Sequence, residues 1–350
     1  MRDGKKLFNQ RLMMDCSSWL RRRTLPNRLI FTFLTVLSLA MESYAQEPIN
    51  AQNKALEQNK MDKEPGPLNL EWKTGGGMQF WTDHLHRQGY RLQQNAITGH
   101  WRLLDADNIR ISWGKRSTCE AVLNRKCPEQ TTKAAPKSTI ILLHGLMRTR
   151  GSMSSLEKEL LSQGFPEVIR FSYASTRGAI SDHAAALREV LENLPAETEF
   201  RFVGHSMGNI VVRHLVGDLE KEDSKKVLPR CKSIVMLGPP NQGATIARRL
   251  APTGVFGWIT GAGGLELGPE WEKLKKNLAT PGFPFAIIAG DVSSQVIQNP
   301  LTEGSGDFVV SVEEAKLEGA QWLRTVPVLH SFLMDDPSVQ KWTIEFLKEH

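Results

Sequence analysis

Gly204-His205-Ser206-Met207-Gly208 is a G-x-S-x-G stretch that indicates the fold of the sequence on either side of it. An apolar run, Glu199–Val203, precedes the stretch, and a segment with helical spacing, Asn209–Leu219, follows it. In that setting a strand leads into a sharp turn that carries the serine, and a helix leaves directly afterwards. Glycine on both sides of the turn avoids collisions around a strained backbone position. The stretch therefore predicts Ser206 as a nucleophile, with the N–H groups of the following helix directed at a developing oxyanion.

From residue 138 onward, apolar β runs alternate with amphipathic helical segments. The expected strands are Thr139–Leu143, Val168–Phe171, Glu199–Val203, Ser233–Leu237, Phe285–Ala289 and Arg324–Val326. The expected helices are Ser154–Ser162, Asp182–Leu194, Asn209–Leu219, Trp271–Asn277 and Val339–Lys348. This alternation is typical of an α/β fold with a mainly parallel, doubly wound sheet that helices cover on both faces. Active sites in such sheets lie beyond the carboxyl ends of the strands, which is where Ser206 falls.

A nucleophilic serine needs a base that takes its proton, an acid that orients the base, and donors for the oxyanion. We expect His330 to be the base, because it follows the last expected strand and precedes the final helix. Two aspartates compete for the role of the acid: Asp291 directly follows an expected strand, and Asp307 precedes a short apolar stretch. Asp335 and Asp336 are instead expected to cap the final helix.

Two backbone N–H groups are predicted to receive the oxyanion. One belongs to Leu146, in the loop after the strand Thr139–Leu143, because that loop supplies a donor in folds of this kind. The other belongs to Met207, the residue immediately after the serine.

The sequence resembles the α/β-hydrolase superfamily, and most of all its small bacterial lipases and related esterases. In those proteins the first strand ends in His-Gly, as His144-Gly145 does here, and the serine stretch is often identical to residues 204–208. A turn similar to Leu237–Gly243 follows the next strand, and the acid often precedes an apolar stretch and a serine, as in Asp307–Ser311. Asp291 has no such pattern after it. The resemblance covers the chain from Ser138 to the C-terminus.

The resemblance implies a serine hydrolase that cleaves carboxylic esters through an acyl-enzyme intermediate. Ser206 would attack the ester, His330 would relay the proton, and Asp307 would orient His330. The N–H groups of Leu146 and Met207 would hold the oxyanion. This chemistry needs no metal and no cofactor.

The resemblance is incomplete at Met147–Arg150, because in those proteins a further glycine often follows the oxyanion residue. This difference leaves the exact geometry of the oxyanion site undecided, but it does not change the expected reaction class. Acyl transfer or thioester hydrolysis would use the same residues, and a catalytically inactive binding module on this fold is the alternative from another class. We expect a small-molecule or lipid ester substrate and no nucleic-acid partner. Transient contact with lipid surfaces, acyl chain length and oligomeric state are left open.

Residues 1–45 are predicted to be a signal peptide. Arg21-Arg22-Arg23 and Arg28 form a charged region before the apolar run Leu29–Ala40, and Ser43-Tyr44-Ala45 offers a cleavage site after Ala45. The segment holds eight Arg or Lys against three acidic residues, and so carries five of the six net positive charges of the 350-residue chain. Basicity confined to a leader argues against nucleic-acid binding. We expect export to the periplasm or medium; an uncleaved membrane anchor is the alternative.

Between the leader and residue 138 the sequence predicts two further segments. Residues 46–69 have the polar composition of a flexible linker. Residues 70–137 are predicted to be an N-terminal extension, with 138–350 as the α/β-hydrolase domain. Within the extension we expect a helix Met78–Arg87, strands Tyr90–Asn95, His100–Leu104 and Ile109–Trp113, and a polar excursion Ser117–Lys137. Cys119 and Cys127 in that excursion are predicted to form a disulfide.

Ala251–Gly268 is expected to form a mobile cover over an acyl-binding groove. Its core, Pro252–Gly264, mixes large apolar residues with five glycines, which weaken regular structure and permit hinge motion. The apolar residues would be costly to expose unless an apolar group lies beneath them. An ordinary packed loop is the alternative.

Overall fold

The computed structural model describes residues 71–76, 78–128, 137–250, 255–293 and 305–350. The predicted signal peptide, residues 1–45, and the predicted linker, residues 46–69, lie outside the described residues. No helix in the described ranges is both long enough and apolar enough to cross a membrane.

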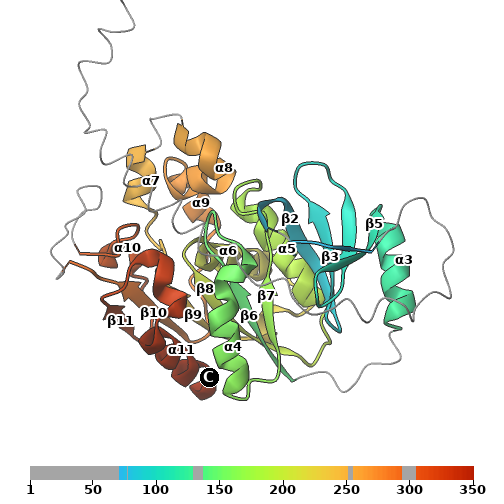
Figure 1. The fold of residues 1–350 in the computed structure, drawn as a ribbon. Coiled ribbons are helices and arrows are strands. Elements are labelled where there is room, and N and C mark those ends of the chain that lie inside the picture. Colours follow the sequence, from blue (N-terminus) through green and yellow to red (C-terminus); the bar gives the residue numbers. More distant parts are fainter. Residues whose placement is uncertain (1–70, 77, 129–136, 251–254, 294–304) are drawn as a thin grey trace, which may run out of the picture. The chain divides into compact units, whose positions relative to one another are not determined.

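Six strands form the larger sheet, in the spatial order β11-β10-β9-β8-β6-β7 (Figure 1). Their bounds are β6 Ser138–Leu143, β7 Val168–Phe171, β8 Glu199–His205, β9 Cys231–Leu237, β10 Phe285–Gly290 and β11 Leu323–Val326. Every neighbouring pair is parallel. The strands are apolar along most of their length because both faces of the sheet are covered. This is the topology of an α/β-hydrolase sheet, and it confirms the predicted fold class.

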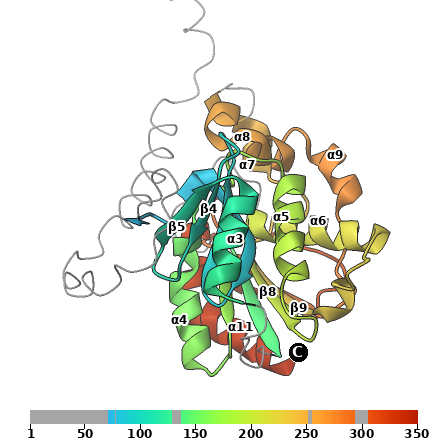
Figure 2. The ribbon, with the colours of Figure 1, turned by 90° about the vertical axis from the view of Figure 1, so that its right-hand side faces the viewer.

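Long helices cover both faces of this sheet (Figure 2). Helices α5 (Ile180–Glu192) and α6 (Met207–Lys221) contribute their apolar side chains to the core on one face. Helices α4 (Ser154–Ser162) and α11 (Pro337–Glu349) pack on the other. Asp336 accepts hydrogen bonds from the first N–H groups of α11, as expected of a helix cap.

Further helical elements lie in the part of the chain that follows β6. They are η3 Arg150–Met153, η4 Leu228–Arg230, α7 Thr245–Leu250, α8 Val255–Leu267, α9 Trp271–Leu274, η6 Lys275–Asn277, α10 Val312–Ala315 and η7 His330–Asp335. The predicted helix Trp271–Asn277 thus consists of one α-helical turn followed by one 3₁₀ turn.

Helix α8 occupies most of the stretch in which glycines were expected to weaken regular structure, so residues 255–267 are helical in spite of their glycines. Residues 251–254 of the same stretch lie outside the described residues. The helix is interrupted at Gly261, whose φ of 64° and ψ of −159° are not helical. A side chain would be strained at this φ, so the glycine permits a kink inside the helix.

The N-terminal part of the described chain forms a second, antiparallel sheet, in the order β1-β5-β4-β3-β2. Its strands are β1 Trp72–Lys73, β2 Trp81–Arg87, β3 Tyr90–Asn95, β4 Trp101–Leu104 and β5 Ile109–Gly114. The helix predicted over residues 78–87 is absent: a 3₁₀ turn, η1 (Met78–Phe80), is followed by strand β2. The two-residue turn Gln88-Gly89 has positive φ at both positions, which joins two antiparallel strands in a hairpin.

Helix α3 (Arg116–Lys126) replaces the expected polar excursion and packs on one face of the N-terminal sheet. Cys119 and Cys127 are both buried in this small core, and both are free thiols. Eight residues of helix separate their Cα atoms by about 12 Å, whereas a disulfide requires less than about 7 Å. The predicted Cys119–Cys127 disulfide is therefore wrong.

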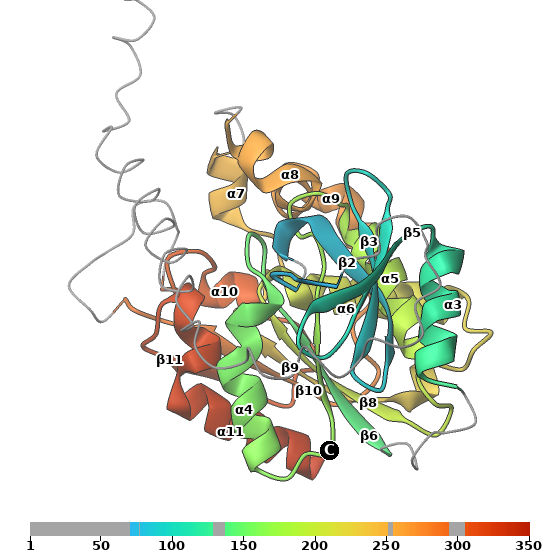
Figure 3. The ribbon, with the colours of Figure 1, turned by 45° about the vertical axis from the view of Figure 1, so that its right-hand side comes forward.

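Strand β2 attaches the N-terminal sheet to the parallel sheet, next to α5 (Figure 3). The Asp83 N–H donates to the Ser172 carbonyl at 2.8 Å, and the Ser172 N–H donates to the Asp83 carboxylate at 2.8 Å. Burial alone would raise the pKa of Asp83, but His86 and Arg91 beside it hold that pKa well below its usual range. The carboxylate therefore stays charged inside the junction. Both sheets belong to one compact unit, Lys63–His350.

Candidate active site

Ser206 occupies the turn between β8 and α6 with an unusual backbone conformation. Its φ of 53° and ψ of −122° lie in a region that residues other than glycine rarely adopt. The Ser206 N–H donates to the Leu237 carbonyl at 2.9 Å, and the Asn209 N–H and side-chain amide both donate to the Ser206 carbonyl. These bonds hold the strained turn, as expected where backbone strain serves a site.

The two glycines of the G-x-S-x-G stretch are required by close neighbours. A Cβ atom at Gly204 would lie 2.3 Å from the side-chain oxygen of Asn209. A Cβ atom at Gly208 would lie 2.7 Å from the Leu143 carbonyl oxygen, at the end of the adjacent strand. Both distances are shorter than any tolerable contact, so the spacing seen in the sequence follows from the tightness of this turn.

Asp307 and His330 form a buried pair. The Nδ1 atom of His330 lies 2.6 Å from the Asp307 carboxylate, whose other oxygen accepts the N–H groups of Val309 and Val310. A carboxylate only accepts hydrogen bonds, so His330 donates from Nδ1, and the neutral form of the ring has its free lone pair on Nε2. The second expected acid, Asp291, instead accepts the N–H of Ser293.

The strand ends β9 and β10 bring this pair to the serine turn. A Cβ atom at Gly238, which follows Leu237 and has a φ of 50°, would lie 3.0 Å from the His330 ring. The imidazole therefore lies against the segment whose carbonyl accepts the Ser206 N–H. On the next strand, a Cβ atom at Gly290 would lie 2.5 Å from the Cβ of Asp307. Two glycines thus leave the space that Asp307 and His330 occupy.

The oxyanion donors expected from the sequence lie on both sides of the serine. The turn Gly145–Arg148 is closed by a hydrogen bond between its first and last residues, and Met147 in it has a φ of 60°. A Cβ atom on the first residue of this turn would lie 3.0 Å from the Ser206 Cβ. Within the described residues, the N–H groups of Leu146 and Met207 have no hydrogen-bond acceptor. Both are therefore available to a ligand.

His205 contacts His330, and this contact could not be recognised from the sequence. Its Nε2–H donates to the His330 carbonyl at 2.9 Å, and the two rings are 4.8 Å apart. Burial, and then the neighbouring His330, lower the pKa of His205 well below its usual value, so the ring is neutral. His205 comes directly before Ser206 in the sequence, and no pattern there indicates that its side chain contacts residue 330.

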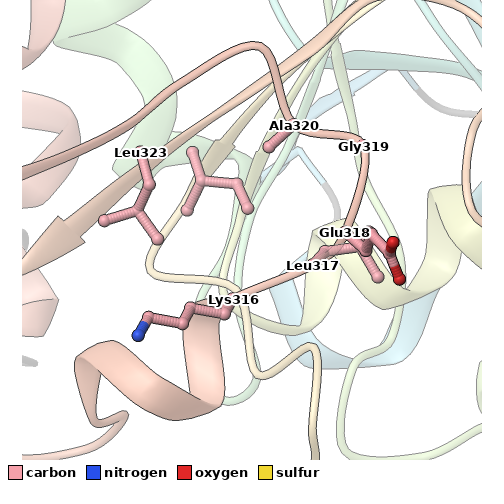
Figure 4. A pocket seen from close by; sticks show the side chains of 7 residues that line it. Lys316, Leu317, Glu318, Gly319, Ala320 and Leu323 are labelled. Atoms are coloured by element: carbon pink, nitrogen blue, oxygen red, sulfur yellow. The ribbon is translucent and has the colours of Figure 1, made fainter.

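Two further observations concern possible ligand sites in the described part of the chain. The described residues contain no cluster of three or more His, Cys, Asp or Glu side chains that could hold a metal ion. A pocket of about 420 Å³ lies by the loop that leads into β11, and Ser206, Asp307 and His330 are not among its lining residues (Figure 4). It is lined by Ile287, Lys316, Leu317, Glu318, Gly319, Ala320 and Leu323.

Comparisons with known proteins give one family model and several solved structures. The model, described as a domain of unknown function (DUF7379), matches residues 107–276. No curated protein matches the chain. A Listeria innocua gene product is 18% identical, with 61% of this chain and 94% of that chain covered and a TM-score of 0.43. A lipase from Bacillus licheniformis is 17% identical, with coverage of 63% and 94% and a TM-score of 0.46. A phospholipase from Legionella pneumophila is 20% identical, with coverage of 52% and 45% and a TM-score of 0.41.

Proposed function

We propose that this α/β-hydrolase-fold protein is a serine hydrolase that cleaves carboxylic esters. One observation carries the proposal: Ser206 stands at a strained turn, and the hydrogen-bonded pair of His330 and Asp307 lies beside that turn. A nucleophile, a base with a free lone pair and a buried acid are the three groups that acyl transfer to serine requires.

In the proposed reaction, Ser206 Oγ attacks the ester carbonyl carbon while His330 Nε2 accepts the hydroxyl proton. The carbonyl oxygen becomes an oxyanion between the N–H groups of Leu146 and Met207. The ester C–O bond then breaks, and the alcohol leaves with the proton from His330. Water repeats these steps on the acyl-enzyme and releases the acid. Asp307 keeps the imidazole in the tautomer that each step needs.

The surroundings of the site support an apolar substrate. Three large apolar side chains near it are exposed: Leu329 (38%) and Phe332 (48%) flank His330 in the chain, and Phe80 (41%) follows a residue that contacts the Gly145–Arg148 turn. Exposed apolar groups around a site favour a ligand with an apolar part. We therefore propose a lipid or other apolar ester as the substrate class.

Helix α8 supports the proposal of a cover over the acyl group. A Cβ atom at Gly263 would lie 2.9 Å from Met207 Sδ, and one at Gly261 would lie 2.0 Å from the Thr176 carbonyl oxygen. The kinked helix therefore lies directly against the residue that would donate to the oxyanion. Acyl transfer and thioester hydrolysis would use the same groups, and export remains a proposal that rests on the sequence of residues 1–45.

The test is hydrolysis of p-nitrophenyl esters of increasing chain length, with fluorophosphonate labelling of the nucleophile. Ser206→Ala should lower kcat by roughly 10⁵- to 10⁶-fold and abolish labelling, while the melting temperature stays near that of the parent. Ser162→Ala, which changes an exposed serine on α4, is the matched control and should keep full activity. Activity of Ser206→Ala within tenfold of the parent would rule out the proposed mechanism.

A further inference from the structure

The turn Gly145–Arg148 adopts a conformation that its own sequence disfavours. Its third residue, Met147, has a φ of 60°, in a turn position that usually requires glycine. A methionine at this φ is strained, so contacts from outside the turn must stabilise it. Because the N–H of Leu146 belongs to the same turn, those contacts also decide where that N–H points.

Three hydrogen bonds outside the turn supply this support, and Gln79 makes two of them. The Met147 N–H donates to Ser175 Oγ at 3.1 Å, and Ser175 Oγ–H donates to Gln79 Oε1 at 2.9 Å. Gln79 Nε2 donates to the Arg148 carbonyl at 2.6 Å. A carbonyl only accepts hydrogen bonds, so the orientation of the Gln79 amide is fixed. One glutamine thus holds two consecutive residues of the turn, one through Ser175 and one directly.

Gln79 comes from the N-terminal sheet region, not from the parallel sheet. It lies on η1, directly before β2, and Thr176 Oγ1 donates a further bond to its Oε1 at 3.3 Å. Strand β2 is held in place by the paired bonds between Asp83 and Ser172, and by the Ala174 N–H that donates to Thr82. The position of Gln79 is therefore set by the hydrogen bonds between Asp83 and Ser172, because Asp83 follows Gln79 by only four residues in the sequence.

We infer that Gln79 is a positioning residue of the oxyanion site: it holds the turn so that the Leu146 N–H faces the oxygen bound at Ser206. The inference rests on the proposed function, because it assigns a task to a turn that matters only if an oxyanion forms. Gln79 does not touch the substrate. Its effect is confined to the state in which the carbonyl oxygen carries negative charge, so it should appear in kcat and not in KM.

The experiment compares Gln79→Glu and Gln79→Ala with the parent. Gln79→Glu keeps the size of the side chain and an acceptor for Ser175, but replaces the donor to the Arg148 carbonyl by a second acceptor. Hydrolysis of p-nitrophenyl butyrate gives kcat and KM, and inhibition by an alkyl trifluoromethyl ketone, which forms an oxyanion on serine, gives the affinity for the charged state. The control is Gln94→Glu, on β3: in the described part of the chain its side-chain amide donates to the Gly99 carbonyl, within its own hairpin.

Gln79→Glu should lower kcat on the order of tenfold, a fraction of the roughly 10²- to 10³-fold lost when an oxyanion donor is removed. KM should change less than twofold, and the affinity for the ketone should fall by the same factor as kcat. Gln79→Ala combined with Ser175→Ala should cost less than the product of the two single losses, because both act through the same bond. Gln94→Glu should match the parent.

Two results would overturn the inference. The first is a Gln79→Glu variant with parental kcat and parental ketone affinity. The second is a loss of kcat with unchanged ketone affinity. Failure of the proposed function looks different: the parent itself would then neither hydrolyse esters nor take a fluorophosphonate at Ser206.

Discussion

At the scale of single residues, the two candidate acids show what a sequence pattern can decide. Asp307 was favoured by the resemblance because a short apolar stretch follows it, and the structure gives that stretch a physical meaning: two of its N–H groups bind the carboxylate. Among the described residues, Asp291 accepts the N–H of Ser293 in its own loop. The sequence could not predict the 2.6 Å distance between the Asp307 carboxylate and His330 Nδ1, because the two residues are 23 positions apart in the chain.

Asp307→Asn should lower kcat by up to roughly 10⁴-fold, because an amide facing Nδ1 no longer fixes the tautomer that leaves Nε2 free. Asp291→Asn is the matched change on the neighbouring loop and should stay within a few-fold of the parent. Steady-state kinetics on a short-chain nitrophenyl ester measures both. The assignment is wrong if Asp291→Asn proves to be the damaging substitution.

At the scale of elements, the sequence predicted the strands that are buried on both faces and the helices that bury one apolar face. All six parallel strands were expected from their apolar runs, and the long helices from their amphipathic spacing. Strand β2 was missed because its buried face carries Asp83, so the alternation that marks a strand is broken by a charge. Helix α3 was missed because its residues are mostly polar. Gln79 could not be found either, since its contacts depend on how the two sheets meet.

Helix α8 offers a test at the element scale, since Gly261 tolerates no side chain. Gly261→Ala should displace the kinked helix, because the new methyl group would meet the Thr176 carbonyl and φ is 64°. We expect a loss of about 1–3 kcal/mol in the free energy of unfolding. If α8 covers the acyl group, the ratio of decanoate to acetate ester hydrolysis should also fall.

Gly282→Ala is the control for α8, because a Cβ atom there would meet no atom within 4 Å. It should change the free energy of unfolding by less than about 0.5 kcal/mol and leave chain preference unchanged. A Gly261→Ala variant that loses stability but keeps the parental chain preference would remove the cover role and leave a structural helix.

At the scale of the whole molecule, three buried histidines make folding sensitive to acid. Burial lowers the pKa of His144 to about 4 and that of His183 to about 3, and lowers that of His205 well below its usual value. In the unfolded chain histidines bind protons below about pH 6.5. Below that pH the unfolded state holds up to three more protons than the native state. The free energy of unfolding therefore decreases as the pH decreases, by up to ~4 kcal/mol per pH unit.

Urea unfolding at pH 7, 6, 5 and 4 should show this decline beginning below about pH 6.5. His183→Gln removes one of the three groups and should reduce the slope by ~1.4 kcal/mol per pH unit between pH 6 and 4. His100→Gln, at an exposed position, is the matched control and should leave the slope at its parental value. A slope that His183→Gln does not change would contradict the assignment of a neutral buried His183.

The junction between Asp83 and Ser172 has a consequence for how such proteins can be rearranged. Recombination preserves stability when few hydrogen bonds connect the exchanged segment to the rest of the protein. Here Asp83 and Ser172 each donate a backbone N–H to the other residue, so the two sheets are bonded in both directions. A chain beginning at β6 would retain Ser206, Asp307 and His330, yet Ser172 and Ser175 would lose the hydrogen bonds that they make with Asp83 and Gln79. The N-terminal sheet therefore cannot be transferred to another α/β hydrolase unless that protein has residues equivalent to Ser172 and Ser175 after its own strand β7. Gene fusions and deletions in this protein should spare the whole segment from β2 onward.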